Sequence, residues 1–204
     1  MLRLPAVVRS IPISLPRRWL RRLLGRAAPQ DIMKIMRFRT ELYGAHFLPL
    51  KREAFRQPSW WSVEEQELFA AYVARLRQCE ICTVLHAVPA SGPGPNGQDA
   101  VAAALADWRS AGLRPPVAAA FRALEILVQD TMSFGAADLD ELRALGAPRA
   151  AIEDLLYIGA VMSIMVRVGS ALGAQLDQSY AGVVRQFGLV TTPSGSRRRS
   201  YSAL

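Results

Sequence analysis

The segment that most constrains the fold is 149–176, where apolar residues occupy nearly every side of a helix. They are Ile152, Leu155, Leu156, Ile158, Val161, Met162, Ile164, Met165, Val168 and Leu172. Such a helix has to be buried, either at the centre of its own domain or between two copies of the chain. The longest largely apolar run, 155–166, is shorter than the ~20 residues of a membrane helix. We therefore expect a central helix, a homo-oligomer and no integral membrane span.

Most other patterned segments also have helical period. Ser62 and Glu65 form a capping box, and the apolar residues that follow recur at helical spacing up to about Arg77. Further helical patterns lie at about 31–43, which stops at Gly44, and at 98–110, 116–131 and 137–145. No segment alternates with period two for long enough to form a strand. The sequence predicts an all-α fold, a single-domain helical bundle.

The basic charge of the chain lies at its two ends. The 204 residues carry a formal charge of +8, but ten of the 25 basic residues fall in 1–30 or 197–199. The remaining 15 face 17 acidic residues in 31–196, so the body is mildly acidic and offers no nucleic-acid surface. We expect a basic, proline-containing arm at 1–30, a helical domain at 31–190 and a flexible tail at 191–204.

The arm does not look like an export signal. It contains the basic amphipathic stretch "LPRRWLRRLLGR" but no apolar region of the length that a secretory signal requires. It is either a solvated extension or an arm that binds an anionic membrane or a partner. With only two cysteines, three residues apart, the chain has no disulfide framework, and we expect a cytoplasmic protein.

Three reactive side chains lie close together in "RLRQCEICTVLHA". Cys79, Cys82 and His86 are spaced i, i+3 and i+7, so on one helix they share a stripe. A helix that begins near Gln78 would place Cys79 at its N-terminus, where the dipole favours the thiolate. His86 could take a proton from Cys82 or stabilise its thiolate. The bland alternative is a pair of small buried hydrophobes beside a packed histidine.

Other known uses of such residues fit less well. A structural zinc site needs four ligands, and the chain's only other histidine, His46, is distant in sequence. Haem attachment needs histidine directly after the second cysteine, whereas three residues intervene here. A thioredoxin-like pair needs a preceding strand. We therefore expect neither a metal nor an organic cofactor.

Glu67 is a further candidate whose role depends on the fold. It precedes Cys79 by twelve residues, which is ~18 Å along a straight helix. If one helix ends near Arg77 and another starts at Cys79, the two could fold back and place Glu67 against His86. Without that break, Glu67 is a solvated residue beside the apolar stripe.

The stretch "EQELFAAYVARLRQCEICTVLHA" resembles the core motif of the alkyl hydroperoxidase D (AhpD) and carboxymuconolactone decarboxylase superfamily. That motif is a glutamate, eleven residues, and then C-x-x-C-x-x-x-H. The block "LDELRALGAPRAAIEDLLYIGAVMSIMVRVGSALG" is similar to the superfamily's second half, and the resemblance covers about 31–177. It is strongest to the peroxidase-related branch; the decarboxylase branch lacks the cysteine pair.

The resemblance implies an AhpD-like, oligomeric bundle that reduces hydroperoxides with thiols. Cys82 would attack the peroxide, Cys79 would resolve the product to a disulfide, and His86 with Glu67 would relay protons. An external dithiol, or a lipoyl group on a partner protein, would reduce the disulfide again. The chain departs from AhpD at Ile81, where AhpD has a histidine between its cysteines.

The alternative to an enzyme is a non-catalytic helical oligomer, such as a thiol redox sensor or a partner-binding subunit. In that alternative the cysteine pair would regulate assembly instead of consuming peroxide. Repeated turnover of peroxide in the presence of a dithiol distinguishes the two, because a sensor is oxidised once.

Overall fold

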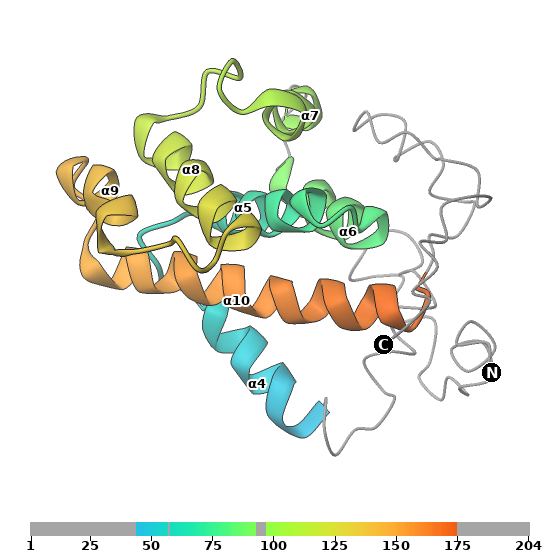
Figure 1. Cartoon of the computed structure of the whole chain (residues 1–204). Coiled ribbons are helices and arrows are strands. Elements are labelled where there is room, and N and C mark those ends of the chain that lie inside the picture. The colour runs from blue at the N-terminus through green and yellow to red at the C-terminus, as the bar shows by residue number, and fades with distance from the viewer. Residues whose placement is uncertain (1–43, 57, 93–96, 175–204) are drawn as a thin grey trace.

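The computed structural model describes residues 44–56, 58–92 and 97–174, and within them every regular element is a helix (Figure 1). The elements are α4 (Gly44–Ala54), α5 (Val63–Leu76), α6 (Glu80–Ala90), α7 (Gly97–Asp107), α8 (Pro115–Gln129), the 3₁₀ helix η1 (Ala136–Leu139), α9 (Asp140–Ala144) and α10 (Arg149–Ala171). The prediction of an all-α fold is confirmed. The predicted arm at 1–30, the tail at 191–204 and both ends of the 31–190 domain lie outside the described residues.

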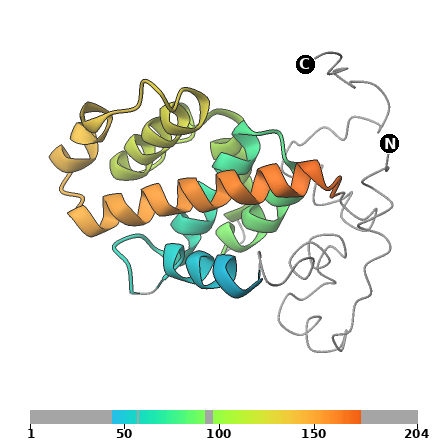
Figure 2. The ribbon, with the colours of Figure 1, turned by 60° about the horizontal axis from the view of Figure 1, so that its bottom comes forward.

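The apolar helix α10 is central, as its sequence predicts. It runs the length of the described bundle, with α4 along one side and α8 along the other (Figures 1 and 2). Leu155, Ile158 and Met162 are fully buried, whereas Tyr157 and Ile164 are exposed. Self-association through α10 stays a prediction. Among the helices of the described residues, none is long and apolar enough to cross a membrane.

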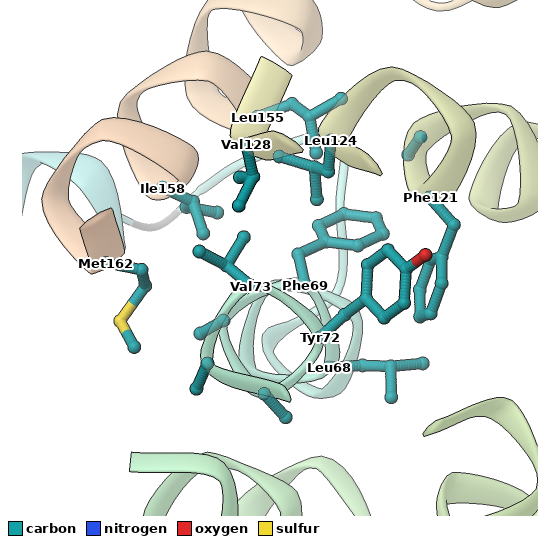
Figure 3. Close-up of a cluster of buried hydrophobic side chains, with 14 of the residues drawn as sticks. Leu68, Phe69, Tyr72, Val73, Phe121, Leu124, Val128, Leu155, Ile158 and Met162 are labelled. Atoms are coloured by element: carbon teal, nitrogen blue, oxygen red, sulfur yellow. The ribbon is translucent and has the colours of Figure 1, made fainter. Parts of the chain in front are cut away.

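The core is built around α5. Its buried face packs against α8 and α10, and the side chains of the three helices interdigitate (Figure 3). Tyr72 and Phe121 stack with ring centroids 4.2 Å apart. Phe69 meets Trp61 and Phe121 edge to face, at centroid distances of 4.9 and 6.1 Å. Because the inner face of α5 is locked in this way, its opposite side has a fixed position from which to present Glu67.

The start of α5 is fixed by the predicted capping box. Ser62 Oγ accepts the amide of Glu65 at 3.2 Å, and Glu65 Oε2 accepts the amide of Ser62 at 3.0 Å. The Arg114 guanidinium donates to the other Glu65 oxygen at 2.6 and 2.9 Å. Just before the cap, the Trp61 indole donates to the carbonyl of Ala151 at 2.7 Å. The N-terminal end of α5 is thereby tied to α10.

Two predicted helix boundaries are wrong. The helix expected at 31–43 lies outside the described residues, so its end at Gly44 stays a prediction. The described part of α4 spans Gly44–Ala54 and was not predicted; Pro49 lies inside it and weakens its helical signal. The predicted helix at 137–145 is a 3₁₀ turn followed by the short α9. The end expected near 176 lies at Ala171, because Gly173 adopts φ +68° and stops α10 with a C-terminal glycine turn.

Candidate functional site

The break between α5 and α6 is a C-terminal helix turn built without glycine. Gln78 has φ +56°, and the amides of Gln78 and Cys79 donate to the carbonyls of Arg75 and Ala74, each at 3.0 Å. This is the pattern of a Schellman motif, in which glycine usually occupies the left-handed position. The turn ends α5 at Leu76 and starts α6 at Glu80, so α6 folds back along α5 as the sequence suggests.

The left-handed turn gives a prediction about stability. A side chain at a left-handed position is strained, so Gln78→Gly should raise the free energy of unfolding by about 0.5–1 kcal/mol. The matched control is Gln129→Gly in α8, where glycine should instead destabilise by about that amount. Urea unfolding of the reduced variants measures both changes. A Gln78→Gly variant less stable than the wild type would contradict this account of the turn.

The folded-back helices place Glu67 against His86. Nδ1 of His86 lies 2.6 Å from Glu67 Oε2, across nineteen residues of sequence. The histidine side chain is 9% exposed and that of the glutamate 21%. With Nδ1–H donating to the carboxylate, Nε2 is the nitrogen left to accept a proton. The pair thus has the arrangement of an oriented base, with the carboxylate reaching toward solvent.

The two cysteines form a buried, reduced pair at the start of α6. Their sulfurs are 2.8 Å apart, both thiols are free, and the residues are 5% and 2% exposed. Cys79 is the N-cap residue, and its carbonyl accepts both the amide and the hydroxyl of Thr83 at 2.9 Å. Since Cys82 lies in the first turn, the two sulfurs meet above the helix N-terminus.

The environment shifts the pKa values of the two thiols in opposite directions. A hydrogen bond from the Cys82 thiol lowers the pKa of Cys79, assisted by the Cys82 amide and by Ser170, against burial and the charge of Glu80. The same hydrogen bond, together with burial and the Cys79 charge, raises the pKa of Cys82, and Lys51 opposes this only weakly. Of the two thiols, Cys79 is therefore the one that loses its proton more easily.

This difference in pKa predicts an order of reactivity toward an alkylating agent. In brief exposure of the reduced protein to iodoacetamide, Cys79 should be labelled before Cys82, since only the thiolate reacts. As the pH falls, the labelling rate should drop only when the lowered pKa of Cys79 is passed, below the ~8.5 of an ordinary thiol. Peptide mapping by mass spectrometry identifies the labelled residue. First labelling at Cys82 would contradict the assignment.

Two further helices border the site, and sequence analysis missed their contribution. Phe55, directly after α4, stacks on the His86 ring with centroids 5.8 Å apart and planes at 19°. From α10, a methyl group at Gly169 would lie 4.0 Å from the Cys82 sulfur. An isolated glycine in an apolar helix is a signal of close approach, and it could have pointed to Gly169. No sequence signal pointed to Phe55.

The site has no metal-binding character within the part of the chain that the structure describes. No group of three or more histidine, cysteine, aspartate or glutamate side chains is placed to hold a metal ion there. The donors that do meet are two thiols and one histidine–glutamate pair. Their arrangement can pass a proton and exchange two electrons between thiols and a disulfide.

Comparison with known proteins identifies the fold. No sequence-family profile matches the chain, and no curated protein does. Among solved structures, a peroxidase-related protein from Silicibacter sp. TM1040 is similar, with a TM-score of 0.70 and 21% identity over 85% of this chain and 93% of its own. A peroxidase-related protein with an AhpD core from Ralstonia eutropha JMP134 has a TM-score of 0.71 and 16% identity, covering 83% of this chain and 92% of its own.

An enzyme with another activity also has this fold. The debrominase Bmp8, solved as a cysteine-to-alanine variant in complex with 2,3,4-tribromopyrrole, has a TM-score of 0.66 and 17% identity over 84% of this chain and 88% of its own. The chain thus has the fold of the AhpD-like, peroxidase-related proteins, as its motif suggests. The fold by itself does not select the substrate, because one protein with this fold is a debrominase and others are described as peroxidase-related.

Proposed function

We propose that this chain is a thiol-dependent hydroperoxide reductase, in which Cys79 and Cys82 alternate between dithiol and disulfide. The observation that supports this most is the 2.6 Å contact between Nδ1 of His86 and Oε2 of Glu67. His86 lies one helical turn after Cys82 of the free cysteine pair. A dithiol alone can be oxidised, but repeated turnover also needs a group that removes and returns protons. The AhpD-like fold adds support at the level of the class of protein.

The cycle begins with the removal of the Cys82 proton. Because the pKa of Cys82 is raised, this thiol needs a base, and His86 supplies Nε2 for the proton while Glu67 stabilises the imidazolium that forms. The Cys82 thiolate then attacks the terminal oxygen of the hydroperoxide, and the O–O bond breaks. His86 returns the proton to the departing alkoxide, giving an alcohol, and Cys82 becomes a sulfenic acid.

The second half of the cycle uses the other sulfur. Cys79, whose pKa is lowered, attacks the Cys82 sulfur as a thiolate; the S–O bond breaks, a disulfide forms and hydroxide leaves as water after protonation. An external dithiol, such as a reduced lipoyl group, then reduces the disulfide by exchange. It supplies two electrons and is itself oxidised to a disulfide. In this cycle Cys79 acts as the thiol with the lowered pKa, whereas Cys82 depends on His86 to remove its proton.

Turnover of an organic hydroperoxide with dihydrolipoate tests the proposal. The wild type should consume peroxide repeatedly, and Cys82→Ser should reduce the rate to background, a loss of at least ~10³-fold. With dihydrolipoate left out, Cys79→Ser should consume about one equivalent per chain and retain a sulfenic acid, because that acid has no internal partner. A wild-type rate no faster than that of Cys82→Ser would refute the enzyme.

The alternative of a non-catalytic sensor or partner-binding oligomer makes a different forecast for the same experiment. A sensor would lose two hydrogens on oxidation and change its oligomeric size without continued consumption of peroxide. The oriented base favours the enzyme, because a disulfide that forms once per signal has no need of a proton relay. Size-exclusion chromatography of oxidised and reduced protein supplies the second readout.

A further inference from the structure

The His86 ring is held on two sides. Glu67 binds the ring edge through Nδ1, and Phe55 covers one ring face at 5.8 Å with nearly parallel planes. The χ2 angle of histidine is broadly distributed, so a hydrogen bond at one nitrogen leaves the ring plane free to tilt. An aromatic neighbour stacked on the face opposes that tilt. Phe55 thus fixes a degree of freedom that the Glu67 contact does not.

The residue that follows Phe55 is held by a buried carboxylate on α10. Asp154 is 2% exposed, and one of its oxygens accepts Nε and Nη2 of Arg56, the residue after Phe55, at 3.1 and 3.0 Å. Its other oxygen accepts the hydroxyl of Ser59 at 2.7 Å. Gln66 Nε2 of α5 donates to the backbone carbonyl of Arg56 at 3.4 Å. The chain beside Phe55 is therefore fixed from both α5 and α10.

A contribution to stability does not account for the Arg56–Asp154 ion pair. An ion pair of this kind adds little net stability, because the buried Asp154 carboxylate loses its hydration and the Arg56 side chain, 43% exposed, is screened by water. The specific effect of Asp154 is geometric: it determines where Arg56 lies, and with it the adjoining Phe55. Phe55, in turn, covers one face of the His86 imidazole in the candidate relay.

We infer that Phe55 is a positioning residue for His86, and that the Arg56–Asp154 ion pair acts through it to keep Nδ1 on Glu67 and Nε2 free for the proton. The inference deepens the proposed function and rests on the role given there to His86. The inference gives neither Phe55 nor the Arg56–Asp154 ion pair a contact with the reacting sulfur. Their effect on the chemistry is confined to the tautomer and orientation of one ring.

The test combines imidazole NMR with a double-mutant cycle. The chain has two histidines, so ¹⁵N signals of the reduced protein are assigned by comparison with His46→Gln. The variants are Phe55→Leu, which removes stacking at similar size; Phe55→Tyr, which retains it; and Asp154→Asn, alone and with Phe55→Leu. Phe134→Leu, at a partly buried phenylalanine of the α8–η1 loop, is the matched control, and circular dichroism confirms that each variant is folded.

The wild type and Phe55→Tyr should show a protonated Nδ1 and an unprotonated Nε2 on His86. Phe55→Leu should show averaging between the two tautomers and a turnover rate about 10- to 100-fold lower. Asp154→Asn should show the same change in milder form, and the double variant should be no worse than Phe55→Leu, since both act through one ring.

Unchanged ¹⁵N signals in Phe55→Leu would overturn the inference, as would fully additive losses in the double variant. If Asp154→Asn does not fold, the comparison of Phe55→Leu with Phe55→Tyr still decides. The NMR readout does not require peroxidase activity. Inactive wild-type protein with the expected tautomer change would overturn the proposed function and leave the positioning role standing.

Discussion

Replacing His86 by glutamine is expected to lower the rate of hydroperoxide turnover by about 10²- to 10⁴-fold, the range that general acid–base catalysis contributes. The physical reason is the raised pKa of Cys82, which keeps that thiol protonated unless a base removes its proton. Glutamine retains a polar side chain of similar reach but cannot be protonated. Steady-state peroxide consumption with an excess of dithiol measures the loss.

The second histidine provides the matched control. His46 lies exposed on α4, and His46→Gln should leave the rate within about twofold of the wild type, as is usual for surface substitutions. Glu67→Gln should fall between the two variants, because it keeps a hydrogen-bond partner for Nδ1 but removes the charge that stabilises the imidazolium. A His86→Gln rate within threefold of the wild type would eliminate the relay from the mechanism.

Truncation of Phe69 should be the most damaging single change to the fold. Phe69→Ala is expected to lower the free energy of unfolding by about 3–5 kcal/mol, because the ring is fully buried between Trp61 and Phe121 and its removal leaves a cavity. Chemical denaturation of the reduced protein, followed by circular dichroism, gives the change. Val63→Ala, at the exposed start of the same helix, should shift stability by less than about 0.5 kcal/mol.

The location of Phe69 also makes the core prediction relevant to the site. Phe69 is two residues from Glu67, and it anchors α5 from the face opposite α6. A loosened α5 should therefore reduce turnover beyond the fraction that is unfolded. If Phe69→Ala loses stability but retains the full rate per folded molecule, the packing of α5 does not govern the Glu67–His86 contact.

The sequence predicted the helices with strong local signals and failed where tertiary contacts decide. The start of α5 was predictable because Ser62 and Glu65 satisfy each other's backbone amides, a purely local interaction. The helix α4 was not predicted, because Pro49 interrupts its pattern and its packing partner, α10, lies a hundred residues away. The end of α10 was missed because the apolar pattern continues past Gly173, although its left-handed conformation ends the helix.

The candidate site shows the same division. Cys79, Cys82 and His86 lie within eight residues, so helical spacing alone places them together. The Glu67 contact depended on whether the helix would end at "LRQC". Gln78 makes that turn with a left-handed backbone, which is usual for glycine and not predictable for glutamine. Phe55 stacks on the imidazole next to Arg56, whose ion pair with Asp154 spans 98 residues, and no pattern within one sequence encodes such a pairing.

Because both sulfurs lie within one helical turn, a disulfide between them would form inside a single helix and its N-cap. Cys79 caps α6 and Cys82 sits three residues on, a separation that a disulfide can span without moving the backbone. Oxidation of the pair would therefore take place within a single element of the bundle, α6 with its N-cap residue.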